Sequence, residues 1–379
     1  MEIDIITIVI CSILILSAVI TSLCNGFFRI PKKREGDGAA DSKAPQLSIV
    51  IAAHDNAEEL KVNLPLLLSQ QYPAEFEVIV VDESSSDETD DVLTLLKNEY
   101  SNLYTTFIPQ SSHYLSRRKL ALTVGVKAAR YEWIIFTDAD CAPDTDQWLA
   151  TMAQSCTVSN DIVIGYTNYD SESKAFYRFD QLLTALYSMR QATRKYAYRA
   201  CGGNLAVRKS TFMKSNGFLQ NLKYLRGEYD FMVNEYCRPG RTAISPSPTS
   251  FMHRNTPSRK SWLNTKLYYM ETRKHLNRSR GYRSLFNTDM LLLHLNYILE
   301  LSAIAGSLIS ANYILTAVAA VSLILTVALR TIICKKALDA FGEHIPVFKI
   351  PFFEIGVIFV NAQLMLRHRM SDRYDFIRK

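Results

Sequence analysis

Cysteines are few in this 379-residue sequence, and no two of them form a Cys-x-x-Cys pair. Their number, seven, is odd, and Cys11, Cys24 and Cys334 lie in hydrophobic stretches. A disulfide framework or a cysteine zinc site needs paired cysteines at short spacings, so neither is expected, and the pattern fits a reducing cytoplasm. Internal repeats and low-complexity tracts are also absent, which excludes a repeat architecture.

Charge is missing from two long stretches. Ile5–Phe28 and Leu301–Leu329 contain no Asp, Glu, Lys or Arg. Because about 20 apolar residues cross a bilayer, residues 1–28 are predicted to be a transmembrane anchor. Residues 286–379 are predicted to hold C-terminal membrane segments at about 290–310, 313–334 and 350–366, followed by a basic tail. The last segment carries Glu354, so it either spans the membrane or lies in its interface.

Basic residues beside these segments predict their orientation, because positive residues stay on the cytoplasmic side. Glu2 and Asp4 precede the first segment and no small-x-small site follows it, so a retained anchor is expected rather than a cleaved signal peptide. The middle of the chain is therefore predicted to be cytoplasmic. The flanking clusters are Arg29, Lys32, Lys33 and Arg34; Arg273, Lys274, Arg278, Arg280 and Arg283; and Lys335 with Lys336.

The tail is basic as well, which conflicts with full spanning of the last segment; its cations are Arg367, Arg369, Arg373, Arg378 and Lys379. Juxtamembrane cations account for most of the net charge of +6. We interpret this charge as contact with anionic membrane lipids rather than with nucleic acid.

Strands and helices alternate between the hydrophobic segments. Residues 29–46 are basic, small and polar and are predicted to be a juxtamembrane linker, and residues 47–285 a single cytoplasmic domain. Continuous apolar strands alternating with helices predict a mostly parallel sheet covered on both faces. Ser85 and Glu88 have the spacing of a capping box that begins one of these helices. The predicted strands are 47–53, 76–82, 103–108 and 133–138.

Aspartates follow two of these strands, where parallel sheets bind their ligands. Asp82 ends the second strand, Asp138 ends the fourth, and Asp140 follows it. Two carboxylates one residue apart favour a hard cation such as Mg²⁺ or Mn²⁺. One alternative is that the pair caps the following helix, although Asp144 or Thr145 already suits that role. An aspartyl phosphatase motif is excluded, because Ala142 stands where it needs Thr or Val.

Four segments together resemble the family 2 glycosyltransferases, whose nucleotide-sugar-binding fold is called GT-A. "TDADCAP" resembles the family's metal-binding DxD segment, and "VVDESSSDET" is similar to VVDDGSTDGT. "RRKLAL" resembles GKxxAL, and "GGNLAVRKSTF" resembles GxNLAYRKxxF. The similarity runs from Leu47 to about Arg283, and the flanking hydrophobic segments match the membrane-anchored, processive-synthase-like group.

The resemblance implies a set of site residues. Mg²⁺ or Mn²⁺ is expected at Asp138 and Asp140. The implied residues for the sugar donor are Ala52, His54, Asn56, Asp82, Glu83, Arg118, Lys119 and Asp138. The implied acceptor-side residues are Gly203, Asn204, Arg273, Lys274 and His275.

The chain departs from the family pattern in three segments. Asn56 in "AAHDNAEEL" replaces a Glu that the family places near the nucleoside. Tyr229 interrupts the acidic segment "RGEYDF", and "ETRKH" replaces the QxxRW signature with Glu271, Lys274 and His275. Lys cannot make the bidentate phosphate contact of Arg.

The implied reaction is an inverting transfer, with Asp230 as the base and Glu228 as the alternative. The expected sugar donor is a nucleotide sugar, with a uridine diphosphate sugar favoured, and the expected acceptor is a lipid-linked or glycan hydroxyl in cell-envelope synthesis. The expected location is the cytoplasmic face of the cell (inner) membrane. The alternative is a non-catalytic family member that binds nucleotide sugar or a partner synthase.

Overall fold

The computed structural model describes residues 4–33, 43–110, 116–194, 197–278, 280–372 and 375–376. Residues 34–42 of the expected linker lie outside these ranges, as do Arg373, Arg378 and Lys379 of the basic tail. The chain divides into two compact units. Met1–Ile30 with Arg278–Ala362 form a helical unit, and Pro31–Asn277 with Gln363–Lys379 form a sheet unit.

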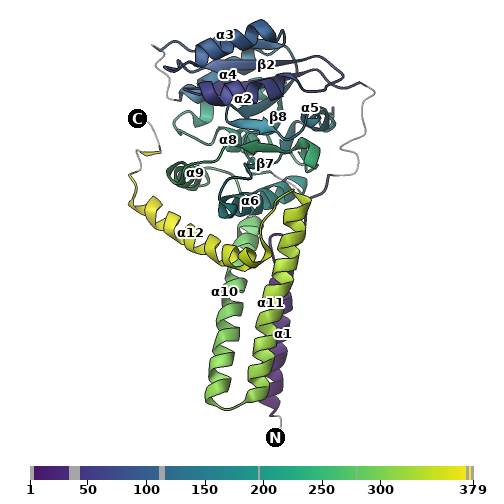
Figure 1. Ribbon diagram of the computed structural model, residues 1–379, viewed down its shortest axis with the longest axis vertical. Helices are drawn as coiled ribbons and strands as arrows, with labels where there is room; N and C mark the ends of the chain where they lie inside the picture. Colours follow the sequence, from purple (N-terminus) through teal and green to yellow (C-terminus); the bar gives the residue numbers. More distant parts are fainter. Residues whose placement is uncertain are drawn as a thin grey trace. The chain divides into compact units, whose positions relative to one another are not determined.

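Four helices carry the hydrophobic segments, and all four are long and apolar enough to cross a membrane. They are α1 (Ile5–Leu23), α10 (Arg280–Ile309), α11 (Tyr313–Ala340) and α12 (Ile350–Met370). Asp4 caps α1 by accepting from the Ile6 amide at 3.4 Å, and Asn312 caps α11 by accepting from the Leu315 amide at 3.1 Å. Within the helical unit, α1, α10 and α11 run side by side (Figure 1).

A buried ion cluster joins the helices of this unit. The guanidinium of Arg330, on α11, lies 3.2 Å from a carboxylate oxygen of Asp289 and 2.8 Å from one of Glu354. It also donates to the carbonyl of Thr21 at 2.7 Å. The cation is 1% exposed, so its partners replace the water that it loses. One side chain thus connects α1, α10, α11 and the first part of α12.

We predict that Arg330→Met destabilises the helical unit by about 3–5 kcal/mol, because it leaves two carboxylates buried without their cation. Thermal unfolding of the detergent-solubilised protein measures the change. Lys335→Met is the matched control, since it removes an exposed ion pair with Asp339 on the same helix. Equal unfolding temperatures for the two variants would contradict a stabilising role of the cluster.

The sheet unit contains a seven-stranded sheet in the order β3-β2-β1-β4-β8-β6-β9. Its first four strands in sequence are parallel, and β8 is antiparallel to both β4 and β6. The sheet is therefore mostly parallel, as the alternation of strands and helices predicts. Its strands are β1 (Leu47–Ala53), β2 (Phe76–Asp82), β3 (Leu103–Phe107), β4 (Trp133–Asp138), β6 (Ile162–Gly165), β8 (Leu205–Arg208) and β9 (Thr242–Ser245).

A second, three-stranded sheet has the order β5-β10-β7. The strand β10 (Met252–Arg254) is antiparallel to β5 (Cys141–Pro143) and parallel to β7 (Thr167–Tyr169). Its register places Arg254 opposite Cys141, the residue that follows the carboxylate pair. This small sheet therefore brings a distant basic residue to the predicted metal site.

Helices cover both faces of the large sheet (Figure 1). One face packs buried leucines of α2 (Ala57–Leu68) and α3 (Thr89–Glu99) together with α5 (Trp148–Ala153) against β1, β2 and β4. The other face carries α4 (Arg117–Ala128), where a Cβ on Gly125 would lie 2.4 Å from a methyl group of Val50. Only glycine permits this close approach. The remaining helices of the unit are α6 (Ala175–Arg194), α7 (Lys209–Lys214), α8 (Glu228–Tyr236) and α9 (Arg259–Thr272).

The predicted capping box before α3 is wrong. The helix begins at Thr89 with Glu88 at the N-cap position, where the Glu88 side chain makes no capping hydrogen bond, and Asp87 accepts from the Thr89 amide at 3.1 Å. Ser85 instead donates to Asp82. The Ser-x-x-Glu spacing missed this because a third polar residue, Asp87, lies nearer to the first free amide groups.

Candidate functional site

The carboxyl ends of β1, β2 and β4 meet at one edge of the large sheet. The strand register places Ala53 opposite Asp82 and Ala52 opposite Asp138. The loops that follow these strands therefore start side by side, and they hold the expected site residues His54, Asn56, Glu83 and Asp140.

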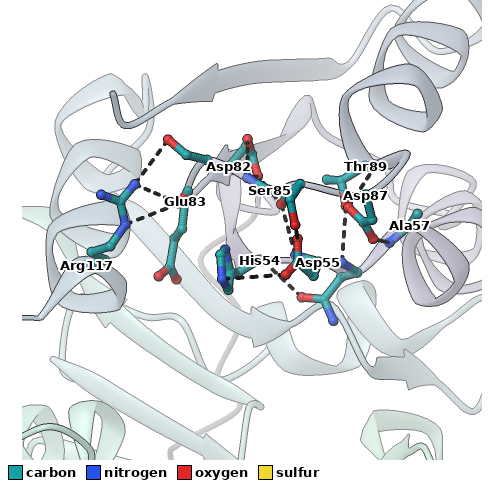
Figure 2. A network of polar contacts seen from close by, with 12 residues as sticks. His54, Asp55, Ala57, Asp82, Glu83, Ser85, Asp87, Thr89 and Arg117 are labelled. Atoms are coloured by element: carbon teal, nitrogen blue, oxygen red, sulfur yellow. Dashed lines mark hydrogen bonds and ion pairs between the residues drawn. The ribbon is translucent and has the colours of Figure 1, made fainter. Parts of the chain in front are cut away.

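Two of these loops are bonded to each other, as Figure 2 shows. The amide of Asp55 donates to Ser85 at 2.9 Å, and the Asp55 carboxylate accepts from the Ser86 amide at 2.7 Å. The Ala57 amide donates to Asp87 at 3.0 Å. Asp55 has a positive φ of 50°, an uncommon conformation outside glycine that these bonds stabilise. The result is a fixed rim at the β1 and β2 end of the site.

Asp82, Glu83 and His54, which are expected to bind the sugar donor, lie on this rim in different surroundings. Asp82 accepts from the Ser85 amide at 3.1 Å. Glu83 is buried, and desolvation raises the pKa of its carboxyl group. His54 is exposed, with Nε2 3.7 Å from the Asp55 carboxylate. In Figure 2 the side chains of His54 and Glu83 extend to the same side of the rim.

The first turn of α4 carries three consecutive cations, an arrangement that the helix dipole disfavours. Each has a partner outside the helix. Arg117 donates to the carbonyl of Glu83 at 2.6 Å, and Arg118 donates to the carboxylate of Asp138. Lys119 is fully buried and donates to two backbone carbonyls, those of Asn221 at 2.6 Å and Tyr224 at 2.7 Å.

Of the two cations expected to bind the sugar donor, Arg118 and Lys119, only Arg118 therefore reaches the carboxylate pair. Arg118 lies against Asp138, whereas the ammonium group of Lys119 is enclosed by backbone. Burial lowers the pKa of Lys119 to about 8. Lys119 thus stabilises the loop that contains Asn221 and Tyr224.

The carboxylate pair is surrounded by hydrogen-bond donors from three elements. Asp138 accepts from Arg118, from the hydroxyl of Tyr229 on α8, and from Arg254 on β10. Asp140 accepts from Arg254 Nε at 3.1 Å. Burial raises the pKa of Asp140, and burial together with Arg118 lowers that of Arg254 to about 10.

These contacts differ from those of a helix cap. Within the described ranges, the Asp138 and Asp140 side chains accept from other side chains, and none of these partners is an amide of α5. Thr145 accepts from the Gln147 amide at 3.3 Å before that helix begins. Asp138 and Asp140 therefore do not cap the helix that follows them, and this alternative is wrong.

The carboxylate oxygens of Asp138 and Asp140 suit a hard divalent cation. Ligand atoms of Asp138, Asp140 and Cys141 lie within 4.8 Å of one another. Carboxylate oxygens are the ligands that Mg²⁺ prefers. Cys141 suits the ion less, because burial raises the pKa of its thiol well above the usual range and keeps it protonated. Arg254 contacts both carboxylates and therefore competes with a metal ion for them.

The acidic segment begins α8. Gly227 precedes the helix with a φ of 94°, and a Cβ there would lie 2.6 Å from Thr272. Glu228 and Asp230 both lie in the first turn, where the helix dipole favours negative charge.

The two acids have different surroundings. Asp230 accepts from the Ala200 amide at 3.0 Å and lies 3.6 Å from Arg199. Burial raises its pKa, although Arg199 opposes that effect. Glu228 is buried, and among the described residues its Oε1 has no hydrogen-bond partner.

A glycine-containing segment connects this acid to the carboxylate pair. It runs from Ala200, which contacts Asp230, to Gly203, where a Cβ would lie 3.1 Å from the amide nitrogen and Cγ of Asp138. Asn204 follows, and its amide donates to the carbonyls of Tyr166 at 3.0 Å and Ser250 at 2.8 Å. Gly203 thus lies against the site, while the side chain of Asn204 holds neighbouring loops.

The remaining expected acceptor-side residues lie at the end of α9. Lys274 and His275 both contact Glu271, at 2.7 Å and 3.2 Å. A third contact comes from His368 at 2.9 Å. Burial alone would raise the pKa of Glu271, but these three hydrogen bonds outweigh it and lower the pKa to about 2. The acceptor-side roles of Arg273, Lys274 and His275 stay predictions.

Sequence reasoning missed two residues of this site. Arg254 lies on a three-residue strand, 114 positions after Asp140, and only the pairing of β10 with β5 brings it there. Tyr229 was noted for replacing an acid, whereas its hydroxyl reaches Asp138. No local pattern in the sequence signals either contact.

The fold is that of the nucleotide-sugar-binding GT-A enzymes. A mannosyltransferase from Pyrobaculum calidifontis, solved in complex with GDP-Man and Mn²⁺, matches with a TM-score of 0.50 at 14% sequence identity. The match covers 86% of this chain and 97% of that one. This likeness establishes the fold class.

Sequence comparison identifies one domain of the chain. Residues 48–215 match the family described as Glycosyl transferase family 2. This part of the chain is therefore a family 2 glycosyltransferase domain. A chondroitin synthase from Escherichia coli is 26% identical over 132 residues, which cover 35% of this chain and 18% of that protein.

A second relative has a more specific name. It is the UDP-Glc:alpha-D-GlcNAc-diphosphoundecaprenol beta-1,3-glucosyltransferase WfaP of Escherichia coli, 27% identical over 144 residues. The match covers 38% of this chain and 51% of that protein. The chain therefore spans about half or less of the length of these curated relatives.

Two substitutions test the metal site with opposite expected signs. Asp140→Ala removes a ligand and is expected to weaken Mn²⁺ binding at least about tenfold, whereas Arg254→Met removes a competing cation and is expected to strengthen it. Titration of Mn²⁺ alone, followed by electron paramagnetic resonance, measures both affinities. Unchanged Mn²⁺ affinity in Asp140→Ala, with the fold intact by circular dichroism, would contradict the site.

Proposed function

We propose that the protein is an inverting glycosyltransferase that moves a sugar from a nucleotide-diphosphate donor to a lipid-linked or glycan acceptor. The observation that carries the proposal is the Asp138–Asp140 pair at the carboxyl edge of a GT-A sheet, together with the half-buried acid Asp230, which accepts from Ala200 in the segment that leads to Gly203. Family membership over residues 48–215 supports the reaction type.

The proposed location is the cytoplasmic face of the cell (inner) membrane, in the synthesis of a cell-envelope glycan. Four helices long and apolar enough to cross a membrane support the membrane assignment. The name of the relative WfaP, with its diphosphoundecaprenol acceptor, supports a lipid-linked acceptor. The basic clusters next to the hydrophobic segments support the orientation.

In the proposed reaction the acceptor hydroxyl oxygen forms a bond to the anomeric carbon as the bond from that carbon to the phosphate oxygen breaks. Asp230 takes the hydroxyl proton, and the bonding electrons leave with the nucleoside diphosphate. Arg118 and Arg254 are the cations nearest to the pair and would contact the departing phosphates. A divalent ion held by Asp138 and Asp140 would neutralise charge on the leaving group.

The raised pKa of Asp230 suits a general base, because a base works best when its pKa approaches the operating pH. Arg199 keeps the carboxylate available by favouring its charged form. Glu83, His54 and Asp82 are proposed to line the nucleoside end of the site, since they project from the fixed rim of β1 and β2.

One observation favours a non-catalytic member of the family. Both oxygens of Asp138 accept hydrogen bonds from protein side chains, those of Arg118, Tyr229 and Arg254, and these side chains would compete with a metal ion for the carboxylate. Such a protein would bind nucleotide sugar or a partner synthase without turnover.

A panel of nucleotide sugars tests the proposed function. The purified full chain, supplied with Mn²⁺, is expected to release nucleoside diphosphate from one of them, and calorimetry is expected to show tighter binding of uridine diphosphate than of guanosine diphosphate. The WfaP name, which contains UDP-Glc, supports the uridine expectation. Binding without release would favour the non-catalytic alternative, and tighter guanosine diphosphate binding would overturn the donor assignment.

The role of Asp230 has its own test. Asp230→Asn is expected to lower kcat at least about 100-fold, the usual scale of general-base catalysis, while the dissociation constant of the donor stays the same. Glu228→Gln is expected to be far milder. The two variants are compared for transfer and for nucleotide binding.

Two results would contradict the assignment of Asp230 as the general base. Lost nucleotide binding in Asp230→Asn would make it a residue of the donor site. An inactive Glu228→Gln beside an active Asp230→Asn would transfer the base to Glu228, whose unpartnered Oε1 lies in the same turn.

A further inference from the structure

The chain that leads into α8 is held from several sides. We call Asn221–Asp230 the acid segment, because it ends with Glu228 and Asp230. Lys119 fixes its beginning through two carbonyls, at 2.6 Å and 2.7 Å. The ring of Tyr224 stacks on Phe231 of α8, with the ring centroids 5.2 Å apart. The residues that make these contacts, Lys119 on α4 and Phe231 on α8, belong to the sheet unit.

A further contact comes from the far end of the chain. The amide of Leu225, in the middle of the acid segment, donates to the carbonyl of Phe376 at 3.2 Å. The ring of Phe376 is buried and lies 5.6 Å from that of Tyr268 on α9 and 5.3 Å from that of His368. Residues after the last hydrophobic helix thus contact the segment that carries the two candidate bases.

Glu271 anchors the described residues at this end of the chain, 368–372 with Asp375 and Phe376, which we call the C-terminal stretch. Its carboxylate binds His368, on the last turn of α12, at 2.9 Å, and His275 at 3.2 Å. The ring of His275 stacks on Tyr224 with the centroids 4.3 Å apart. One carboxylate therefore joins the C-terminal stretch to the acid segment. This contact gives a physical reason for an acid at position 271, because an ionised carboxylate can accept from three cationic or histidine side chains at once.

We propose that His368 and Phe376 are positioning residues for the acid segment, so that the C-terminal stretch completes the geometry of the catalytic acids without touching substrate. The proposal rests on the proposed transferase function for its kinetic consequence, whereas the contacts themselves do not depend on that function. Positioning of a reacting group within a fraction of an ångström governs kcat more than donor affinity.

Two single variants of the full chain test the proposal. Phe376→Ala removes the ring that packs on Tyr268, and His368→Ala removes the bond to Glu271. Each is expected to lower kcat roughly tenfold or more through misplacement of the base, with the donor dissociation constant unchanged. Each is also expected to speed amide hydrogen exchange in peptides that span residues 221–231, relative to peptides from β1 and β4.

Conservative and neighbouring variants provide the controls. His368→Gln keeps an N–H group that can donate to Glu271 and is expected to restore kcat and exchange protection. Arg369→Ala removes an adjacent, exposed cation for which the described structure records no side-chain contact, and it is expected to behave like the wild type.

The two readouts separate the possible failures. If the wild-type protein transfers no sugar, the proposed function fails, while the exchange measurement still tests whether the C-terminal stretch holds the acid segment. Unchanged exchange over residues 221–231 in both alanine variants would overturn the proposal. So would a loss of donor binding equal to the loss of kcat, or a His368→Gln variant no better than His368→Ala.

Discussion

The carboxylate of Asp138 is the point on which the geometry of the site depends. It accepts hydrogen bonds from Arg118 on α4, Tyr229 on α8 and Arg254 on β10, three elements that are far apart in the sequence. A buried charge needs such partners, because an unpaired carboxylate in an apolar environment costs several kcal/mol. Gly203 packs against the same residue, where an added Cβ would lie 3.1 Å from its amide nitrogen and Cγ. Satisfying this single charge therefore fixes four pieces of the chain around the edge of the sheet.

The same constraint orders the acids around it. Because Tyr229 reaches Asp138, its neighbours Glu228 and Asp230 start α8 at a defined distance from the carboxylate pair. Further contacts hold the acid segment that contains them. Lys119 donates to the Tyr224 carbonyl, and the Leu225 amide donates to the Phe376 carbonyl. Glu271 binds His368 of the C-terminal stretch. In the helical unit a buried cation has the same effect, because Arg330 pairs with both Asp289 and Glu354. In both units, buried charges specify which segments meet.

Much of the sheet could be predicted from the sequence, because continuous apolar strands and amphipathic helices are local patterns. β1, β2 and β4 have the predicted bounds, and the carboxyl-edge position of Asp82 and Asp138 follows from parallel pairing. The contacts of Arg254, Tyr229 and His368 could not be predicted, because they depend on antiparallel or helical packing between distant segments. The motif predicts that Lys119 binds the sugar donor; the sequence does not predict that its ammonium group donates to the carbonyls of Asn221 and Tyr224. The cap of α3 was misplaced because three polar residues compete within one turn.

Phosphorus hyperfine coupling to bound Mn²⁺ tests whether Asp138 and Asp140 hold an ion that contacts the diphosphate of the donor. Electron–nuclear double resonance on the full chain with Mn²⁺ and uridine diphosphate reports whether the ion contacts the diphosphate. We expect a coupling of directly coordinated phosphate in the wild type and its loss in Asp138→Asn, because the ion and the diphosphate would meet at that carboxylate. A wild-type spectrum without phosphorus coupling, or an unchanged spectrum in Asp138→Asn, would contradict the placement of the nucleotide-sugar site at this edge of the sheet.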